Sequence, residues 1–207
     1  MHPLVGLVIA YLAGSIPFAY LAGKAKGIDL RQHGSGNLGA TNAMRVLGPR
    51  IGGLVYLCDT LKGMLPALLL PPRIDSPHPE LWAIAFGVAA IVGHVKPIFL
   101  LGQGGGKGVA TAGGVFFGLA WLPTLIAFVC FVTAVAITRY ASVGSLVAAV
   151  TLPLAMLFLR GATDPYFLIS CVIGLFVIWM HRTNISRLRQ GTEPKIGSHN
   201  KAEAEAA

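Results

Sequence analysis

Six long apolar segments alternate with short polar segments along the chain. The apolar segments are Leu4–Ala22, Ile51–Leu70, Leu81–Val95, Val109–Thr138, Val143–Leu159 and Tyr166–Met180. A helix needs about 20 residues to cross the hydrocarbon core of a bilayer, and open sheets cannot satisfy their edge hydrogen bonds in lipid. The pattern therefore predicts an all-α integral membrane protein, although two segments are short and one is too long for a single crossing.

The longest segment, Val109–Thr138, decides how many spans we expect. A single crossing gives six spans and leaves the basic C-terminal segment on the outer side with the N-terminus. A hairpin of two short helices, broken near Trp121-Leu-Pro123, gives seven spans and puts the C-terminus inside. The first arm of such a hairpin, at about 12 residues, reaches only about 18 Å, so whether it crosses fully stays open.

The distribution of basic residues favours seven spans. In that topology the inner loops and tail hold thirteen of the sixteen Lys and Arg residues, Lys62 lies in a span, and the outer loops hold only Arg73 and Arg160. Positive residues concentrate on the cytoplasmic side of membrane proteins. We expect a seven-span bundle with short helices and glycine-rich cytoplasmic loops, its N-terminus outside and its C-terminus inside. Residues 1–189 form the membrane domain and 190–207 a polar cytoplasmic tail.

Composition agrees with the membrane assignment and adds a class of ligand. The chain is 55% hydrophobic and 12% charged, yet carries a net charge of +8. That excess of positive charge favours anionic partners, either lipid headgroups or phosphorylated substrates. The three cysteines are dispersed in apolar segments, which gives neither a disulfide framework nor the spacing of a metal site. We expect no cofactor, no metal and no nucleic-acid partner.

A first polar segment, Gln32–Arg45, is rich in glycine and almost free of acidic residues. Its glycines allow turns in which successive backbone N–H groups point at one anion, and Arg45 offers a planar fork suited to phosphate. An ordinary turn between helices is the alternative. The candidate ligands of this segment are Ser35, Gly36, Asn37, Thr41, Asn42 and Arg45.

A second glycine-rich segment, Gly102–Thr111, surrounds Lys107 and is followed directly by an apolar helix. Free N–H groups and the positive end of the helix dipole favour an anion there. It is not a nucleotide-binding P-loop, because Gly108 stands where that motif needs Ser or Thr. A flexible turn is the alternative. The candidate phosphate ligands are Gly104, Gly105, Gly106, Lys107 and Gly108.

Further polar residues lie at the ends of spans or inside one. His181 and Asn184 fall on one helical face with Leu188, and His181 is a candidate base, phosphate ligand or helix-end cation. The arginines that follow, Arg182, Arg187 and Arg189, are by default headgroup anchors. Ser142 either caps the next helix or donates to a ligand. Asp59 and Lys62, three residues apart inside a span, are expected to pair, since charges in a membrane are costly.

Three of these segments, in this order and spacing, resemble the bacterial acyl-phosphate:glycerol-3-phosphate acyltransferase family: Gly34–Arg45, Gly104–Thr111 and His181–Glu193. The resemblance implies a seven-helix enzyme of the bacterial cytoplasmic (inner) membrane, with its active site on the cytoplasmic face. It would transfer an acyl group from acyl phosphate to the 1-hydroxyl of glycerol-3-phosphate, giving lysophosphatidic acid and inorganic phosphate, the first committed step of phospholipid synthesis. Its partners would be acyl phosphate, glycerol-3-phosphate and membrane lipids.

The resemblance also carries residue roles. The essential serine and arginine of the family fall on Ser35 and Arg45, its glycerol-3-phosphate loop on Gly104–Gly108, and its activity-linked histidine and asparagine on His181 and Asn184. The structurally important glutamate falls on Glu193.

Both substrates carry phosphate, which explains a basic pocket containing Lys107 and Arg45. We expect direct attack without a covalent intermediate, with Ser35 and Asn184 orienting the substrates or stabilising the oxyanion. The base is either His181 or a substrate phosphate. A transporter or channel for a phosphorylated solute is the rival function, although basic loops on one side and the lack of a clear inverted repeat count against it.

Overall fold

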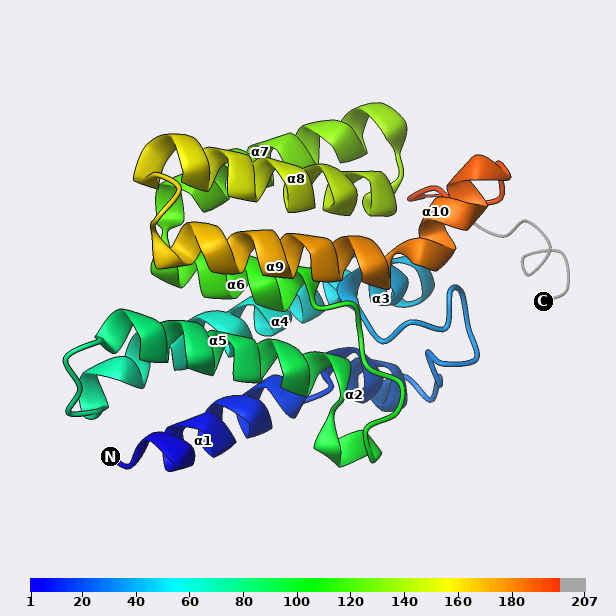
Figure 1. Ribbon diagram of the computed structural model, residues 1–207. Helices are drawn as coiled ribbons and strands as arrows, with labels where there is room; N and C mark the ends of the chain where they lie inside the picture. Colours follow the sequence, from blue (N-terminus) through cyan, green and yellow to red (C-terminus); the bar gives the residue numbers. More distant parts are fainter. Residues whose placement is uncertain (198–207) are drawn as a thin grey trace, which may run out of the picture.

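The computed structural model describes residues 1–197, and all regular secondary structure in this part of the chain is helical (Figure 1). Its α-helices are α1 (Pro3–Ser15), α2 (Phe18–Ala25), α3 (Ala40–Leu47), α4 (Pro49–Leu69), α5 (Pro79–Val95), α6 (Val109–Leu119), α7 (Trp121–Thr138), α8 (Ala141–Arg160), α9 (Pro165–Met180) and α10 (Arg182–Arg189). Two short 3-10 helices follow α4 and α5. The expected all-α architecture is confirmed for the described residues.

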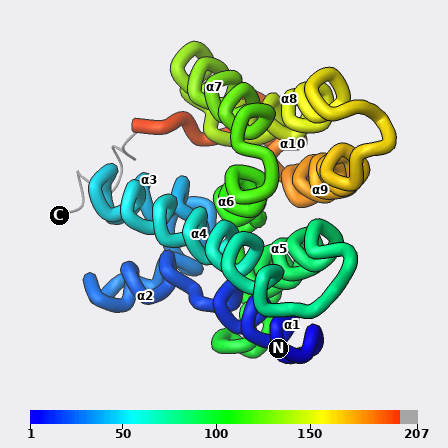
Figure 2. Tube along the Cα trace, turned by 90° about the vertical axis from the view of Figure 1, so that its left-hand side faces the viewer, coloured from blue at the N-terminus to red at the C-terminus, as the bar shows by residue number. Residues whose placement is uncertain are grey.

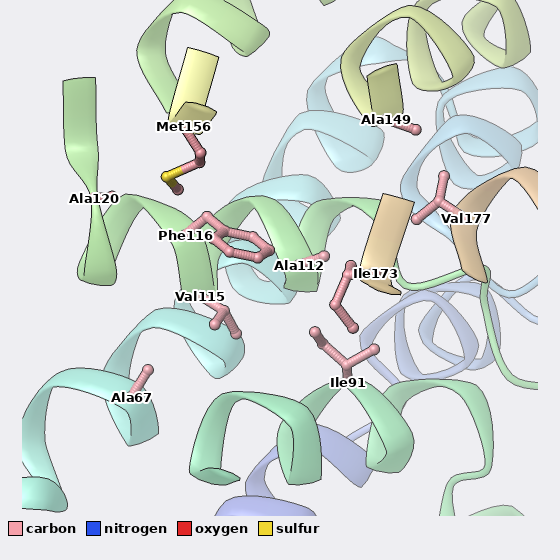
Figure 3. Packing of buried hydrophobic residues seen from close by; sticks show 10 residues of the cluster. All are labelled: Ala67, Ile91, Ala112, Val115, Phe116, Ala120, Ala149, Met156, Ile173 and Val177. Atoms are coloured by element: carbon pink, nitrogen blue, oxygen red, sulfur yellow. The ribbon is translucent and has the colours of Figure 1, made fainter. Parts of the chain in front are cut away.

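The short helix α6 lies at the centre of the bundle, with α4 and α5 on one side and α8 and α9 on the other (Figure 2). A cluster of buried side chains surrounds it and joins α4, α5, α8 and α9 (Figure 3). Phe116 on α6 and Met156 on α8 are almost fully buried there. Because neighbouring helices surround α6, eleven residues are enough to make it the core of the fold.

Close packing of α6 against α4 depends on glycine. A Cβ atom at Gly114 would overlap the carbonyl oxygen of Thr60, and one at Gly63 would overlap that of Thr111. Small residues at such crossings let helix backbones approach closely, which is how helices associate in membranes without a hydrophobic driving force between them. The outer faces of the bundle instead carry exposed large apolar residues, such as Phe158 on α8 and Leu175 on α9, as expected for surfaces that face lipid.

The number of crossings is only partly as expected. Five segments are long and apolar enough to span a bilayer, or six if α9 and α10, bent by 54°, count as one span. The break in the long apolar segment is confirmed, since Ala120 ends α6 next to Trp121. However, α7 has 18 residues, so the hairpin joins one short arm to one of full length rather than two short ones.

The expected pair of buried charges is confirmed and has a structural explanation. Lys62 Nζ lies 2.7 Å from Asp59 Oδ1 and donates a hydrogen bond of 2.9 Å to the carbonyl of Ile16. That carbonyl lies just beyond the end of α1, where Pro17 interrupts the first apolar segment. Lys62 therefore satisfies an acceptor that the broken helix leaves open, and Asp59 balances its charge.

The two ends of the bundle differ. At one end the N-terminal amine donates to the carbonyl of Arg73, in the connection between α4 and α5. The opposite end carries α3, α10 and the loop before α6 (Figure 1). Residues 190–197, the first part of the predicted tail, pack back onto this end, where Ile196 exchanges hydrogen bonds with Arg139. The rest of the predicted tail lies outside the described residues.

Candidate active site

A polar pocket of about 110 Å³ opens among the loop before α3, α3 itself, the loop before α6, the start of α8 and the chain from His181 to Pro194. It brings together twelve of the candidate site residues that the sequence singled out, although they come from segments far apart in the chain. These are Ser35, Asn37, Thr41, Asn42, Arg45, Asp59, Lys107, Gly108, Ser142, His181, Asn184 and Glu193.

The first glycine-rich loop is held in shape by Asn42. Its buried side-chain oxygen accepts from the backbone N–H of Ser35 at 2.8 Å, and its amide nitrogen donates to the carbonyls of Leu30 and His33, both at 3.1 Å. The Asn42 amide is thus committed to the protein, so it builds the loop rather than binding a ligand. Ser35, by contrast, remains exposed at the pocket.

Arg45 extends from α3 into the pocket and is about half buried. Its Nη2 donates to the carbonyl of Pro194 at 3.4 Å, while its buried Nε has no hydrogen-bond partner among the described residues. Burial lowers the pKa of Arg45; Glu193 opposes this effect and Arg187 adds to it. A guanidinium with an unmet donor in a partly desolvated pocket is suited to bind an anion.

Lys107 reaches the same pocket from the second glycine-rich loop and donates to Asn184 Oδ1. Gly108 caps α6 with a φ of 80°, a conformation that other residues rarely adopt. Burial, with a further contribution from Arg187, lowers the pKa of Lys107 to about 8. A bound phosphate would favour the charged form and raise this pKa again.

Asn184, Glu193 and Arg187 form a hydrogen-bonded network on the opposite wall. Asn184 Nδ2 donates to Glu193 Oε1 at 2.6 Å, and Arg187 Nε donates to Oε2 at 2.7 Å. Burial alone would raise the pKa of Glu193, but hydrogen bonds from Asn184, Ser142 and Arg187 outweigh it, so the pKa is lowered. Arg187, expected by default as a headgroup anchor, also pairs with Glu193 and lines the pocket.

His181 lies just beyond the end of α9, where the chain bends into α10. Its Nδ1 is 2.8 Å from the carbonyl of Val177, which can only accept, so Nδ1 carries a proton and Nε2 holds the lone pair of the neutral ring. Burial lowers the pKa of His181 to about 4; the Val177 hydrogen bond opposes this and the Lys107 charge adds to it. The ring is therefore neutral at physiological pH and not a helix-end cation.

Ser142 does not cap α8. The cap position is Tyr140, which makes no side-chain hydrogen bond to the helix, whereas Ser142 lies inside the first turn. Its buried Oγ has no partner of good geometry among the described residues, yet it is close enough to Glu193 to help lower the pKa of that carboxyl. The alternative in which Ser142 donates to a ligand is the one that this geometry favours.

Five predicted residues do not line the pocket within the described structure: Gly36, Gly104, Gly105, Gly106 and Lys62. Gly105 and Gly106 instead pack against the end of α5. Conversely, the pocket includes His94, Arg187, Tyr56 and Ser145, which sequence reasoning missed as site residues. His94 and Ser145 are polar residues in apolar helices, and that was the only available signal.

An apolar cavity of about 80 Å³ adjoins the polar pocket. It lies between α6, α7, α8 and α9, and shares Tyr56, Val109, Phe131 and Ser145 with the polar pocket. Its other lining residues are apolar or small, including Phe117, Phe128 and Leu152. The combined site therefore offers a cationic, donor-rich half and an apolar half within the bundle, which suits a ligand with a charged head and a hydrocarbon chain.

Comparison with known proteins agrees with this chemistry. Residues 4–191 match the family model described as glycerol-3-phosphate acyltransferase. The chain is 47% identical over 195 residues to the glycerol-3-phosphate acyltransferase of Parasynechococcus marenigrum, covering 94% of this chain and 90% of the relative. It is 45% identical over 198 residues to that of Geobacter sulfurreducens, covering 95% and 98%.

A solved structure gives the same answer for the fold. The crystal structure of PlsY (YgiH), an integral membrane glycerol 3-phosphate acyltransferase, in its glycerol 3-phosphate form, superposes with a TM-score of 0.86 at 39% identity, covering 95% of this chain and 96% of that one. A second form of PlsY, with lysophosphatidic acid, superposes with a TM-score of 0.83. The chain is therefore a multi-pass membrane protein that belongs to the glycerol-3-phosphate acyltransferase family.

Proposed function

We propose that this protein transfers an acyl group from acyl phosphate to the 1-hydroxyl of glycerol-3-phosphate, giving lysophosphatidic acid and inorganic phosphate. The family and the two ligand forms of PlsY support the acceptor and the product. The observation that carries the proposal is the junction of a cationic pocket with an apolar cavity inside the bundle. A phosphorylated head and an acyl chain can occupy the two halves together, which a site for a polar solute alone would not need.

The cationic groups of the pocket offset the charge of the substrates. Glycerol-3-phosphate and acyl phosphate both carry negative charge, so they repel each other in the low dielectric of a bundle. Arg45 and Lys107, both lining the pocket, would neutralise part of this charge. Ser35 and Asn184 would orient the bound groups, and the unmet donors of Arg45 and Ser142 are available to them.

The reaction needs no covalent enzyme intermediate, since acyl phosphate is already activated. The 1-hydroxyl oxygen forms a bond to the acyl carbon, and the bond from that carbon to the phosphate oxygen breaks. His181 lines the pocket, and Nε2 of its neutral ring would accept a hydrogen bond from the hydroxyl, but a ring with a pKa of about 4 is a weak base. We assign the final proton to the departing phosphate.

The topology that fits this function has seven crossings, with the N-terminus outside and the pocket at the cytoplasmic face of the inner membrane. The N-terminus and α10, which carries pocket residues such as Asn184, lie at opposite ends of the bundle (Figure 1), which agrees with an odd number of crossings between them. The central position of α6 supports counting it as a short crossing. The basic residues of the pocket end agree with a cytoplasmic location.

Product analysis tests the function directly. Protein purified in detergent is incubated with glycerol-3-phosphate and either acyl phosphate or an acyl thioester. The proposal expects lysophosphatidic acid from acyl phosphate only. Product from the thioester alone would refute the donor assignment, and no product from either donor would refute the reaction and favour transport.

A further inference from the structure

The loop from Gly104 to Gly108 packs against the last turn of α5, where the ring of His94 lies directly against Gly106. A Cβ atom at Gly106 would overlap Nε2 of the His94 ring, and one at Gly105 would overlap the carbonyl of Val95. The backbone N–H of Gly106 also donates to the carbonyl of His94 at 3.3 Å. Gly105 and Gly106 therefore serve close approach to α5.

The ring of His94 is buried, and its other edge faces Asp59. Nδ1 lies 3.6 Å from Asp59 Oδ1, with no hydrogen bond between the two atoms, and both residues line the polar pocket. Asp59 is in turn paired with Lys62, which is tied to the carbonyl of Ile16. The ring of His94 is therefore enclosed between Asp59 on α4 and Gly106 in the loop before α6.

The position of His94 is transmitted to Lys107 through one residue. Gly106 rests on the ring, and Lys107 follows it directly, with its Nζ extended to Asn184 across the pocket. A change in the distance between Gly106 and α5 would move the Lys107 backbone by a similar amount. Charge-assisted hydrogen bonds to phosphate are sensitive to such shifts, since they weaken steeply away from their preferred geometry.

We propose that His94 is a positioning residue. It sets the distance of the Gly104–Gly108 loop from α5 and thereby the affinity for the phosphate of glycerol-3-phosphate. The inference rests on the proposed function, in which Lys107 of this loop offsets the charge of the substrate phosphates. His94 acts through Gly106, so its loss raises KM for glycerol-3-phosphate more than it lowers kcat. The KM for acyl phosphate changes little.

A double-mutant cycle between His94 and Gly106 tests the contact. In Gly106→Ala the new methyl overlaps the His94 ring, and in His94→Ala the ring that contacts Gly106 is missing. We expect each change to raise KM for glycerol-3-phosphate about tenfold or more. In the double variant the methyl no longer meets the ring and lies nearest to the Leu38 carbonyl, at 3.0 Å, so KM rises less than in the worse single variant. If the fold-changes in KM of the two single variants multiply in the double variant instead, the position of the loop does not depend on this contact and the proposal is overturned.

His94→Asn distinguishes the role of the ring edge that faces Asp59 from that of the edge that touches Gly106. This test can be read even if Gly106→Ala does not fold. Its amide keeps a polar group near Asp59 but lacks the edge that touches Gly106. We expect the thermal transition of the parent with a KM for glycerol-3-phosphate close to that of His94→Ala. A parental KM in His94→Asn would refute the positioning role. Matched controls are Gly53→Ala, where a Cβ meets open space, and His78→Ala at the exposed start of α5; both should leave KM unchanged.

Lys107→Met separates failure of this inference from failure of the loop assignment. A raised KM for glycerol-3-phosphate in Lys107→Met, together with multiplicative effects in the cycle, rejects the role of His94 and keeps the phosphate loop. An unchanged KM in Lys107→Met rejects the loop as the phosphate site, and the role of His94 with it.

Discussion

At the scale of single residues, sequence alone identified most of the pocket but not how its parts are held. Ser35, Arg45 and Lys107 were recognisable because donors and cations among glycines favour phosphate. Asn42 and His94 were not recognisable as supports, because their partners come from backbone carbonyls and from a loop that the pattern could not place. Lys107, in the loop before α6, and Asn184, on α10, are 77 positions apart and meet only in the folded bundle.

The guanidinium of Arg45 gives the first prediction. Arg45→Lys keeps the charge but loses the guanidinium fork. In the parent protein this fork donates to Pro194 with one nitrogen and has a second donor free for phosphate. Loss of one charge-assisted hydrogen bond costs about 1.5–3 kcal/mol, or roughly ten- to a hundredfold in kcat/KM. The measurement is kcat/KM of purified Arg45→Lys, with Arg50→Lys on the exposed start of α4 as control. Activity within about twofold of the parent would make Arg45 a headgroup anchor.

The pKa of Lys107 gives a second prediction, on pH dependence. Burial lowers this pKa to about 8, so the free enzyme is charged there below pH 8 and loses the charge as pH rises through it. We expect KM for glycerol-3-phosphate to rise above pH 8, by up to about tenfold per pH unit. Lys107→Arg stays charged, so its KM should be flat over the same range. Parallel profiles for the two proteins would argue against Lys107 as the phosphate ligand.

At the scale of elements, the apolar pattern gave the helices but not their bends. The first apolar segment reads as one span, yet Pro17 divides it into α1 and α2, and Lys62 fills the gap from α4. The long segment was expected to break near Trp121 and does so at Ala120. The return of residues 190–197 to the bundle could not be foreseen, because Glu193 finds its partners Asn184 and Arg187 only after α10 has turned away from α9.

The buried pair on α4 gives a prediction on stability. Asp59→Ala leaves Lys62 charged and unpaired in the bundle, which costs about 3–5 kcal/mol. In Asp59→Leu/Lys62→Met no charge remains buried, so the thermal transition in detergent should recover most of that loss. Glu80→Ala, which removes an exposed carboxylate from α5, should change little. A double variant no more stable than Asp59→Ala would show that the pair does not act as a unit.

At the scale of the whole molecule, α6 decides the topology. Five or six segments meet the length of a span by themselves, so the proposed seventh crossing depends on an eleven-residue helix enclosed by its neighbours. Length and hydropathy describe a helix alone in lipid, and they cannot show that α4, α5, α8 and α9 surround α6. The distribution of charge along the loops is the sequence feature that favours this seventh crossing.

Reporter fusions test the topology. A reporter placed after Arg189 should be active only in its cytoplasmic form, and one placed within Pro72–Pro79 only in its external form, since an odd number of crossings separates the two. Fusions at both sites that respond on the same side of the membrane would rule out seven spans.

The most direct test of the central claim is product formation by the purified protein. With glycerol-3-phosphate and acyl phosphate in detergent, we expect lysophosphatidic acid and one equivalent of inorganic phosphate, with no product when an acyl thioester replaces acyl phosphate. Absence of lysophosphatidic acid with folded protein and both substrates present would refute the proposed reaction.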